Sequence, residues 1–404
     1  MRILFDVSIL GYSRLRTQYR TGIYQVAVSL ARALARQPGV EVVAYSSSGN
    51  HLLAREVLDA EGLGSIPVAG SRLWGTLAFA LVLGRNLVHR RGAPALARGI
   101  SRVLGVVQAR RGAADLRLIR SADWYLSPME APPEFLRTPG GPEIALVLHD
   151  LIPLVLKDYR QDPTDPTRWF PRMLQSIRPT DLVFTVSAFT KQDYLRLFPG
   201  FPPGQLVVAP NAVAPGRFGP GPGIAGSHPY FLTVSTVEPR KRIDAIVDAF
   251  QVYRRAGGTA RLMVCGANRQ GHRDNILNRL ADDLRPEVEF TGYLADEELP
   301  KLYRSCLAFV YVSEYEGFGL PVLEAMACGA PVIVSDRTSL PEVAQDAGIF
   351  VSPDDVPALA QALTHLAGDP EARAERSRRS LARAAEFSWD KTAAGIVKAM
   401  GGQR

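Results

Sequence analysis

Residues 316–329 read EGFGLPVLEAMACG and closely follow a short apolar stretch at 308–312. Pro321 suits the first turn of a helix, because the N–H group that proline lacks would be unbonded there, and Gly329 suits the helix end. The stretch therefore predicts a strand, a glycine-rich loop and a helix. Because a helix start presents free N–H groups and a positive dipole end, the same stretch also predicts a phosphate-binding site.

Two carboxylates flank this predicted phosphate-binding site: Glu316 in the loop and Glu324 in the first turns of the helix. They would repel the phosphate itself but accept hydrogen bonds from hydroxyl groups on either side of it. Hydroxyl groups of a sugar on one side of the phosphate and of a ribose on the other would fit this arrangement. The alternative is that both glutamates only stabilise the helix start through its dipole.

Residues 234–242 read VSTVEPRKR and predict a second strand, loop and helix start. Arg240 and Lys241 stand where the helix dipole disfavours cations, so a bound anion would relieve the conflict. The two side chains offer a planar fork and a point charge, and we predict that they bind a diphosphate. The alternative is a run of solvated charges.

Short β-rich runs alternate with helical patterns along the whole chain, which indicates an α/β fold with parallel strands. A first series of strands is expected at 3–7, 42–45, 144–148 and 182–186, and a second at 207–209, 231–234, 262–265, 308–312, 332–335 and 349–351. The sequence therefore predicts two doubly wound sheets, with the change of series near residue 205.

These motifs resemble the retaining glycosyltransferases of family 4, whose glycosyltransferase-B fold has two Rossmann-like domains facing a cleft. The family signature, usually E-G-F-G-x-P-x-x-E, has two glutamates separated by seven residues, and Glu316 and Glu324 match it. The resemblance implies that Glu316 contacts the donor sugar and that Glu324 binds the ribose hydroxyls. It also implies that the diphosphate is approached by the loop and helix start formed by Gly317, Phe318, Gly319 and Leu320.

The E-P-R-K run at 238–241 resembles a subgroup of bacterial mannosyl and deoxyhexosyl transferases of surface polysaccharide synthesis. Many family members have an arginine earlier in this loop, where Thr236 stands here. The resemblance implies that Arg240, beside Lys241, takes over the contact with the diphosphate.

The N-terminal half matches the family at isolated positions. His149 follows a predicted strand in L-H-D-L-I-P, and the resemblance implies that it faces the donor sugar and the acceptor, although a lone histidine is more often structural. Ser187 matches a strand-to-helix element and could equally be a helix N-cap. Asn211 matches an interdomain hinge, and Gly22 a glycine that lets the backbone approach the donor phosphate. An acidic acceptor, or only solvent, would contact the nearby Arg14, Arg16 and Arg20.

The resemblance implies an acceptor-binding domain at 1–205, a nucleotide-sugar-binding domain at 206–385 and a helix at 386–404 that crosses back to the first domain. The implied protein is a cytoplasmic, metal-independent, retaining hexosyltransferase without a further cofactor. Its donor would be a nucleoside-diphosphate sugar, with GDP-mannose or a deoxyhexose donor favoured, and its acceptor a glycan or a lipid-linked glycan. Alternatives are a nucleotide-sugar epimerase of the same fold, a non-catalytic nucleotide-sugar sensor and a basic nucleic-acid-binding protein.

Composition limits these alternatives. The 404 residues are 47% hydrophobic and 22% charged, with a mean hydropathy of -0.00, which is typical of a packed globular protein of about two domains. The three cysteines lie in apolar stretches without metal-ligand spacing and indicate a reduced, intracellular protein. No signal peptide is expected, and the longest apolar run, 73–83, is too short for a spanning helix of about 20 residues.

The net charge of +7 is concentrated in one segment, 72–120, which has ten arginines and one acid, Asp115. Such a local excess favours one interaction surface over general nucleic-acid binding. We predict that this segment holds the protein on the anionic inner face of a membrane, through Arg85, Arg90, Arg91, Arg98 and Arg102 and an apolar stripe of Trp74, Leu77, Leu81 and Val88. The alternative is that the apolar residues are core and the arginines are solvated.

Overall fold

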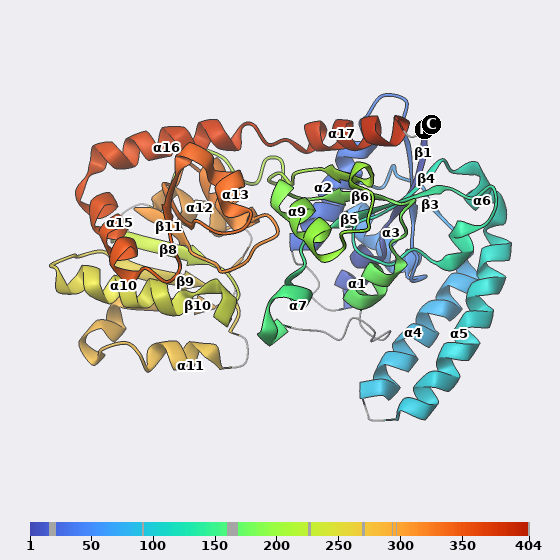
Figure 1. Cartoon of the computed structure of the whole chain (residues 1–404), viewed down its shortest axis with the longest axis horizontal. Helices are drawn as coiled ribbons and strands as arrows, with labels where there is room; N and C mark the ends of the chain where they lie inside the picture. The colour runs from blue at the N-terminus through green and yellow to red at the C-terminus, as the bar shows by residue number, and fades with distance from the viewer. Residues whose placement is uncertain are drawn as a thin grey trace. The chain divides into compact units, whose positions relative to one another are not determined.

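The computed structural model describes residues 1–15, 22–90, 93–159, 169–224, 228–268, 271–292, 294–295 and 297–402. The chain divides into two compact units (Figure 1). The N-terminal unit comprises Met1–Val186, Lys191–Ala209 and Trp389–Arg404, and the C-terminal unit comprises Ser187–Thr190 and Pro210–Ser388. The sequence placed these divisions at 205/206 and 385/386, and it did not anticipate that four residues near 187 group with the second unit.

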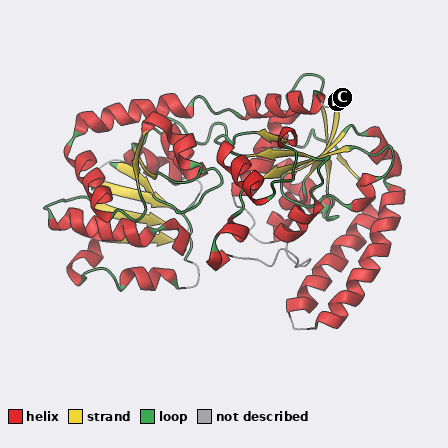
Figure 2. Ribbon diagram, viewed as in Figure 1, coloured by secondary structure: helices red, strands yellow, loops and turns green. Residues whose placement is uncertain are grey.

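The N-terminal unit is built on a parallel sheet of seven strands in the order β3-β2-β1-β4-β5-β6-β7. Figure 2 draws the strands in yellow. Their bounds are β1 Arg2–Asp6, β2 Glu41–Tyr45, β3 Val68–Ala69, β4 Trp124–Ser127, β5 Glu143–Leu148, β6 Leu182–Thr185 and β7 Leu206–Val208. The expected strand at 207–209 was assigned to the second sheet, and this is wrong, because Leu206 pairs with Val183 at the edge of the first sheet. The strand order changes direction between β1 and β4, where doubly wound folds bind ligands.

Helices cover both faces of this sheet, as the buried strands of a parallel sheet require. The helices of this unit are α1 Ser8–Leu15, α2 Gly22–Ala35, α3 His51–Ala60, α4 Arg72–Arg90, α5 Pro94–Ala114, α6 Leu116–Ser121, α7 Ile152–Val155, α8 Trp169–Ser176, α9 Ala188–Leu197 and α17 Trp389–Gly401, and not all of them lie on the sheet. The C-terminal helix α17 packs against α2, where Asp390 pairs with Arg36 at 2.7 Å.

Helices α4 and α5 form a hairpin inserted between β3 and β4 (Figure 1). The two helices share a small core of Ala78, Val82, Leu104 and Val107, against which Trp74 and Leu81 also pack. The predicted outward stripe is therefore wrong at Trp74 and Leu81, because the helix turns these side chains toward α5. Leu77, in contrast, is exposed.

Arg111 of α5 is buried and anchors the hairpin to the sheet. Its guanidinium donates to the carbonyl oxygen of Ser47 at 2.8 Å and to that of Ser46, in the loop after β2. Its Nε lies 3.5 Å from the carboxylate of Asp115, which also accepts a hydrogen bond from Tyr45. This pair cancels in charge, so nine arginines and no acid remain in the segment 72–120.

The C-terminal unit is built on a parallel sheet of six strands in the order β10-β9-β8-β11-β12-β13. Its strands are β8 Tyr230–Val234, β9 Arg261–Cys265, β10 Val288–Gly292, β11 Ala308–Tyr311, β12 Val332–Ser335 and β13 Gly348–Val351. Its helices are α10 Ile243–Arg255, α11 His272–Leu277, α12 Leu299–Ser305, α13 Leu320–Ala327, α14 Leu340–Ala344, α15 Val356–Gly368 and α16 Pro370–Ala384. The predicted α/β class with two parallel sheets is confirmed.

Candidate functional site

The loop at 312–319 leads from β11 into α13, as residues 308–329 predicted. Gly319 ends the loop with a φ of 102°, in the left-handed region that favours glycine. A Cβ atom there would lie 2.5 Å from a methyl group of Leu340, so the turn also depends on the missing side chain. Pro321 lies in the first turn of the helix, where it removes no hydrogen bond.

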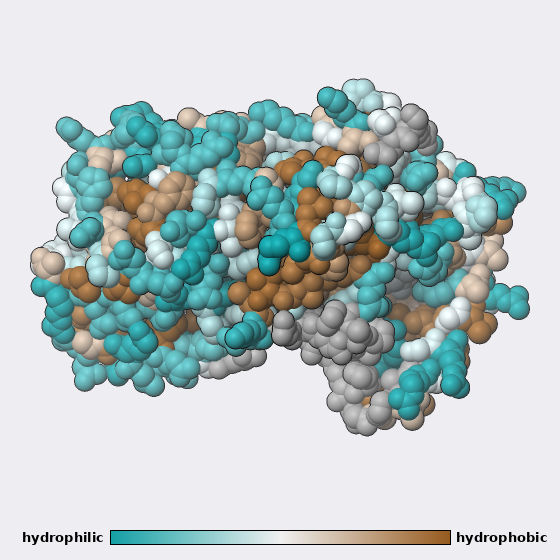
Figure 3. Space-filling view, in the orientation of Figure 1, coloured by the Kyte–Doolittle hydropathy of each residue, from teal (hydrophilic) through white to brown (hydrophobic). Residues whose placement is uncertain are grey.

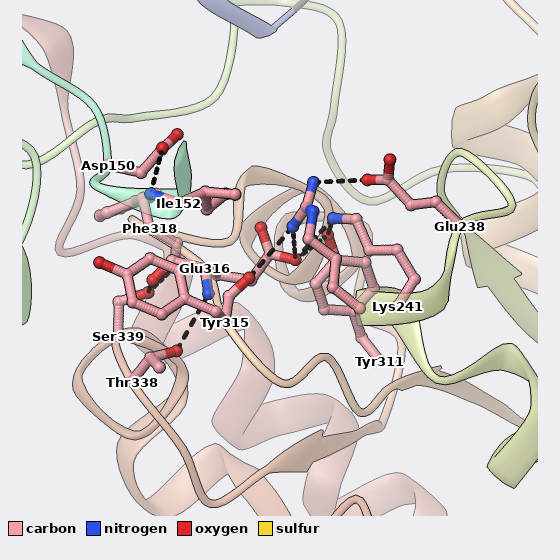
Figure 4. A network of polar contacts seen from close by, with 11 residues as sticks. Asp150, Ile152, Glu238, Lys241, Tyr311, Tyr315, Glu316, Phe318, Thr338 and Ser339 are labelled. Carbon is pink, nitrogen blue, oxygen red and sulfur yellow. Dashed lines mark hydrogen bonds and ion pairs between the residues drawn. The ribbon is translucent and has the colours of Figure 1, made fainter. Parts of the chain in front are cut away.

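Glu316 is the centre of a buried polar cluster (Figure 4). Its Oε1 accepts hydrogen bonds from Nζ of Lys241 at 2.5 Å and from Nη1 of Arg240 at 3.0 Å. Tyr311, the last residue of β11, donates its hydroxyl to the same oxygen at 3.1 Å. The structure thus brings together three residues that the sequence singled out in two separate motifs, and adds Tyr311, which it did not single out.

The electrostatics of this cluster favour an ionised Glu316. Burial alone would raise its pKa, but the charges of Lys241 and Arg240 outweigh burial and lower the pKa to about 2. Burial lowers the pKa of Lys241, and the neighbouring Glu316 opposes that shift. The carboxylate is therefore a hydrogen-bond acceptor at any physiological pH.

Arg240 is held by further contacts on a short turn. It donates to the carbonyl oxygen of Tyr315 at 3.0 Å, and its Nη2 lies 2.8 Å from Oε1 of Glu238 (Figure 4). Arg240 and Lys241 belong to a 3-10 turn, Pro239–Lys241, and α10 begins only at Ile243. The sequence placed both cations at the helix start itself. They precede it, and carboxylates compensate their charge.

Two hydroxyl groups hold the loop that follows Glu316. Ser187 donates to the carbonyl oxygen of Gly317 at 2.6 Å, and Thr190 donates to the same oxygen at 3.1 Å. Ser187 also accepts a hydrogen bond from the backbone N–H of Thr190 at 3.0 Å, so it caps α9 as well. Thr190 was not among the predicted site residues, although it lies in the same V-S-A-F-T-K element.

Glu324 lies in α13, where its Oε2 accepts a hydrogen bond from the hydroxyl of Tyr303 at 3.3 Å. Phe318 is buried, and its backbone oxygen accepts a hydrogen bond from Ser339 at 2.9 Å. Leu320 is the first residue of α13, directly after Gly319. Asn211 is buried near the start of the C-terminal unit.

His149 and Gly22 belong to the N-terminal unit. His149 directly follows β5, and its Nε2 lies 2.7 Å from the carbonyl oxygen of Pro128. Because a carbonyl can only accept, Nε2 carries a proton. Gly22 is the exposed first residue of α2, while Arg16 and Arg20 of the preceding loop lie outside the described residues.

Burial lowers the pKa of His149 to about 4, although its hydrogen bond to Pro128 opposes the shift. The imidazole is therefore neutral at physiological pH. With the proton on Nε2, its Nδ1 is an acceptor for a hydroxyl group.

In the parts of the chain that the structure describes, no group of three or more His, Cys, Asp or Glu side chains is placed to hold a metal ion. None of the helices described there is long and apolar enough to cross a membrane.

Two family models match the chain, "Glycosyltransferase Family 4" over residues 20–217 and "Glycosyl transferases group 1" over residues 220–383. The chain belongs to glycosyltransferase family 4. The glycosyltransferase is 34% identical to O-antigen chain mannosyltransferase B of Escherichia coli over 254 residues, which are 60% of this chain and 66% of that protein. It is 36% identical to the serotype-specific mannosyltransferase WbdA of E. coli over 167 residues, 41% of this chain and 20% of that one. The matches span less than two thirds of these relatives.

Solved structures show the same fold. Anabaena Alr3699/HepE in complex with UDP has a TM-score of 0.67 at 17% identity, and each chain is covered in full. The lipopolysaccharide outer core galactosyltransferase WaaB has a TM-score of 0.64 at 14% identity, again over both whole chains. The family models confirm the predicted family, and these structures confirm the predicted glycosyltransferase-B fold.

Proposed function

We propose that this glycosyltransferase moves a mannosyl residue from GDP-mannose, with retention of configuration, to a hydroxyl group of a glycan or lipid-linked glycan. The buried cluster of Glu316, Lys241 and Arg240 carries this proposal, because it places an ionised sugar-hydroxyl acceptor against two cations. Several mannosyltransferases among the relatives favour mannose, and some of these are named as GDP-mannose-dependent.

The proposed reaction breaks the bond between the anomeric carbon and the diphosphate oxygen and forms a bond from that carbon to the acceptor oxygen. The acceptor attacks from the face that the diphosphate leaves, and the departing phosphate oxygen takes the acceptor's proton. Negative charge grows on the diphosphate during this step, so Arg240, Lys241 and the N–H groups near Gly319 stabilise it. Glu316 accepts hydrogen bonds from the transferred sugar, while Glu324 accepts them from the ribose.

A thermal-shift panel of nucleoside diphosphates, followed by a transfer assay, tests the function. GDP should raise the melting temperature most, because it is the nucleotide part of the proposed donor. A ligand at 100 times its Kd stabilises a protein by about 2.7 kcal/mol, which such a panel detects. GDP-mannose with a mannose-terminated glycan should then yield GDP and an extended glycan in equal amounts. An epimerase would release sugar without an acceptor, and a sensor would bind without turnover; either outcome would replace the proposal.

Glu324→Ala should weaken GDP binding by roughly 1 to 3 kcal/mol, because the ribose hydroxyls lose a buried acceptor. Isothermal titration calorimetry measures the change. Tyr303→Phe removes the hydrogen bond to Glu324 but keeps the carboxylate, so it should bind GDP nearly as the wild type does. Wild-type affinity in Glu324→Ala would show that this residue does not hold the nucleotide.

Transfer should continue after EDTA treatment, because Arg240 and Lys241 supply the positive charge that a divalent cation provides elsewhere. Initial rates before and after exhaustive dialysis against EDTA measure this. Activity that disappears with the chelator and returns with Mg²⁺ or Mn²⁺ would refute the metal-independent mechanism.

A second proposal concerns the α4–α5 hairpin, which we propose docks on an anionic membrane surface. Apolar side chains at helical spacing face solvent, among them Leu73 (72% exposed), Leu77 and Leu87 on α4. Leu96, Val103 and Val106 (63% exposed) do so on α5. Figure 3 shows hydrophobic and hydrophilic residues mixed on the hairpin surface in view.

The charge of the hairpin and of α6 complements such a surface. The exposed arginines of this segment are Arg72, Arg98, Arg102, Arg110, Arg117 and Arg120. Arg85 is partly buried, and neither Arg91 nor the side chain of Arg90 is among the described parts. Each arginine near an anionic surface contributes about 1 kcal/mol, which falls with salt, and the leucines add burial in the headgroup region.

Co-sedimentation with vesicles of phosphatidylglycerol and phosphatidylcholine tests the membrane proposal. The wild type should bind the anionic vesicles, and the triple variant Arg98→Gln, Arg102→Gln, Arg110→Gln should bind at least tenfold less. The matched control Arg255→Gln, Arg285→Gln, Arg378→Gln removes three exposed arginines of the C-terminal unit and should bind normally. Equal binding to pure phosphatidylcholine, or equal loss in both triple variants, would remove the proposal.

A further inference from the structure

A cavity of about 480 Å³ lies within the N-terminal unit and has no part in the site described above. Its walls come from five places: Tyr12 of α1, the loop after β2, both helices of the α4–α5 hairpin, the stretch 130–135 after β4, and Arg172 of α8. The volume is in the range of small-ligand sites, about 300 to 1,000 Å³. Because its walls include the segments that follow β2 and β4, the cavity lies beside the carboxyl ends of these strands. This is near the point where the strand order changes direction.

The polar part of the cavity wall is incompletely bonded. Glu130, which is 8% exposed, lies 3.5 Å from Nη2 of Arg172. The Nε of Arg172 and the Oε1 of Gln108 are both buried, and neither has a hydrogen-bond partner among the residues that the structure describes. Buried polar atoms are rarely left unpaired, so these two side chains can turn toward a ligand without giving up a hydrogen bond at those atoms, and the carboxylate of Glu130 offers a further acceptor.

The rest of the wall is apolar, and the charges cancel. Val82, Leu104, Pro132 and Phe135 offer surfaces against which the C–H groups of a sugar ring can pack. Glu130 compensates Arg172, while Glu134 at the edge pairs with Arg178 at 2.7 Å. This balance favours a neutral ligand rich in hydroxyl groups over a phosphate or another anion.

The cavity is connected to His149 through one loop. The carbonyl oxygen of Pro128 accepts the hydrogen bond from His149, and Glu130 follows two residues later. The backbone oxygen of Glu130 in turn accepts a hydrogen bond from Ser127 at 2.7 Å. The loop that presents Glu130 is therefore held by the residue proposed to contact the reacting sugar.

We propose that this cavity binds a neutral hexose unit of the acceptor glycan, with Glu130 and Gln108 accepting hydrogen bonds from its hydroxyls and Arg172 donating one. This assignment to the acceptor rests on the proposed transferase function. The hairpin that carries Gln108 thus shapes the acceptor site.

Direct binding of α-1,3-mannobiose, measured by saturation-transfer NMR without a donor, tests the cavity. The wild type should bind the disaccharide. Glu130→Gln and Gln108→Leu should each lose at least tenfold in affinity, and Gln108→Leu removes an Oε1 atom that has no hydrogen-bond partner among the described residues. The matched control Glu143→Gln makes the same carboxylate-to-amide change at an exposed position of the N-terminal unit that does not line the cavity, and it should bind normally. No binding to the wild type, displacement by inorganic phosphate, or equal binding by all variants would overturn the proposal.

Initial rates at saturating GDP-mannose separate this proposal from the proposed function. Glu130→Gln and Gln108→Leu should raise the acceptor KM at least tenfold and leave the melting-temperature shift with GDP unchanged. An unchanged acceptor KM in an active enzyme refutes the acceptor site alone. Disaccharide binding that depends on Glu130, in a protein without any transfer activity, refutes the transferase and leaves a sugar-binding cavity.

Discussion

The double variant Arg240→Ala, Lys241→Ala is expected to lose at least about a hundredfold in kcat for sugar transfer. Both cations lie against Glu316 in the loop that we propose receives the diphosphate, and loss of one preorganised donor to a developing charge costs about 10² to 10³ in other enzymes. Steady-state rates at saturating donor and acceptor measure the effect. Arg242→Gln removes a neighbouring cation that pairs with Asp354 and Glu314 instead, so it should keep near-normal turnover.

The double variant leaves Glu316 buried without its cations, which can destabilise the fold. Thermal melts should therefore accompany the kinetics. The single variant Arg240→Ala keeps the Lys241–Glu316 pair at 2.5 Å and should fold while losing about tenfold in kcat. Wild-type turnover in a folded double variant would refute the role of these cations.

His149→Ala is expected to lower transfer by about tenfold to a hundredfold with almost unchanged GDP affinity. The reason is that the neutral imidazole presents Nδ1 as an acceptor to a sugar hydroxyl, and this contact involves no part of the nucleotide. The exposed His365→Ala serves as the control. Equal losses in transfer and in GDP affinity would make His149 a structural residue.

The pH profile gives a second measure of His149. Because its pKa is lowered to about 4, the neutral form persists well below the ordinary histidine range and is lost only as pH falls through about 4. Glu316, with a pKa of about 2, stays ionised throughout. An acid limb of kcat/KM near pH 6.5 that disappears in His149→Ala would contradict the neutral, hydrogen-bonded imidazole.

The sequence alone determined those features that local chemistry decides. Residues 308–329 predict their own strand, loop and helix, because Pro321 and Gly329 suit the two ends of a helix and Gly319 allows the turn. The fourteen-residue string also identified the family, since its spacing of Glu316 and Glu324 is specific. The alternation of strands and helices likewise predicted both parallel sheets.

Which distant side chains meet depends on how the strands and helices pack together. Lys241 and Glu316 are 75 positions apart, and whether they would pair with each other depends on the packing of two neighbouring parallel strands. Arg111 looked like one more surface arginine, yet the fold buries it against the loop after β2. Local patterns set the secondary structure, but the register of strands and the burial of charges are set by contacts across the whole unit, which no short stretch encodes.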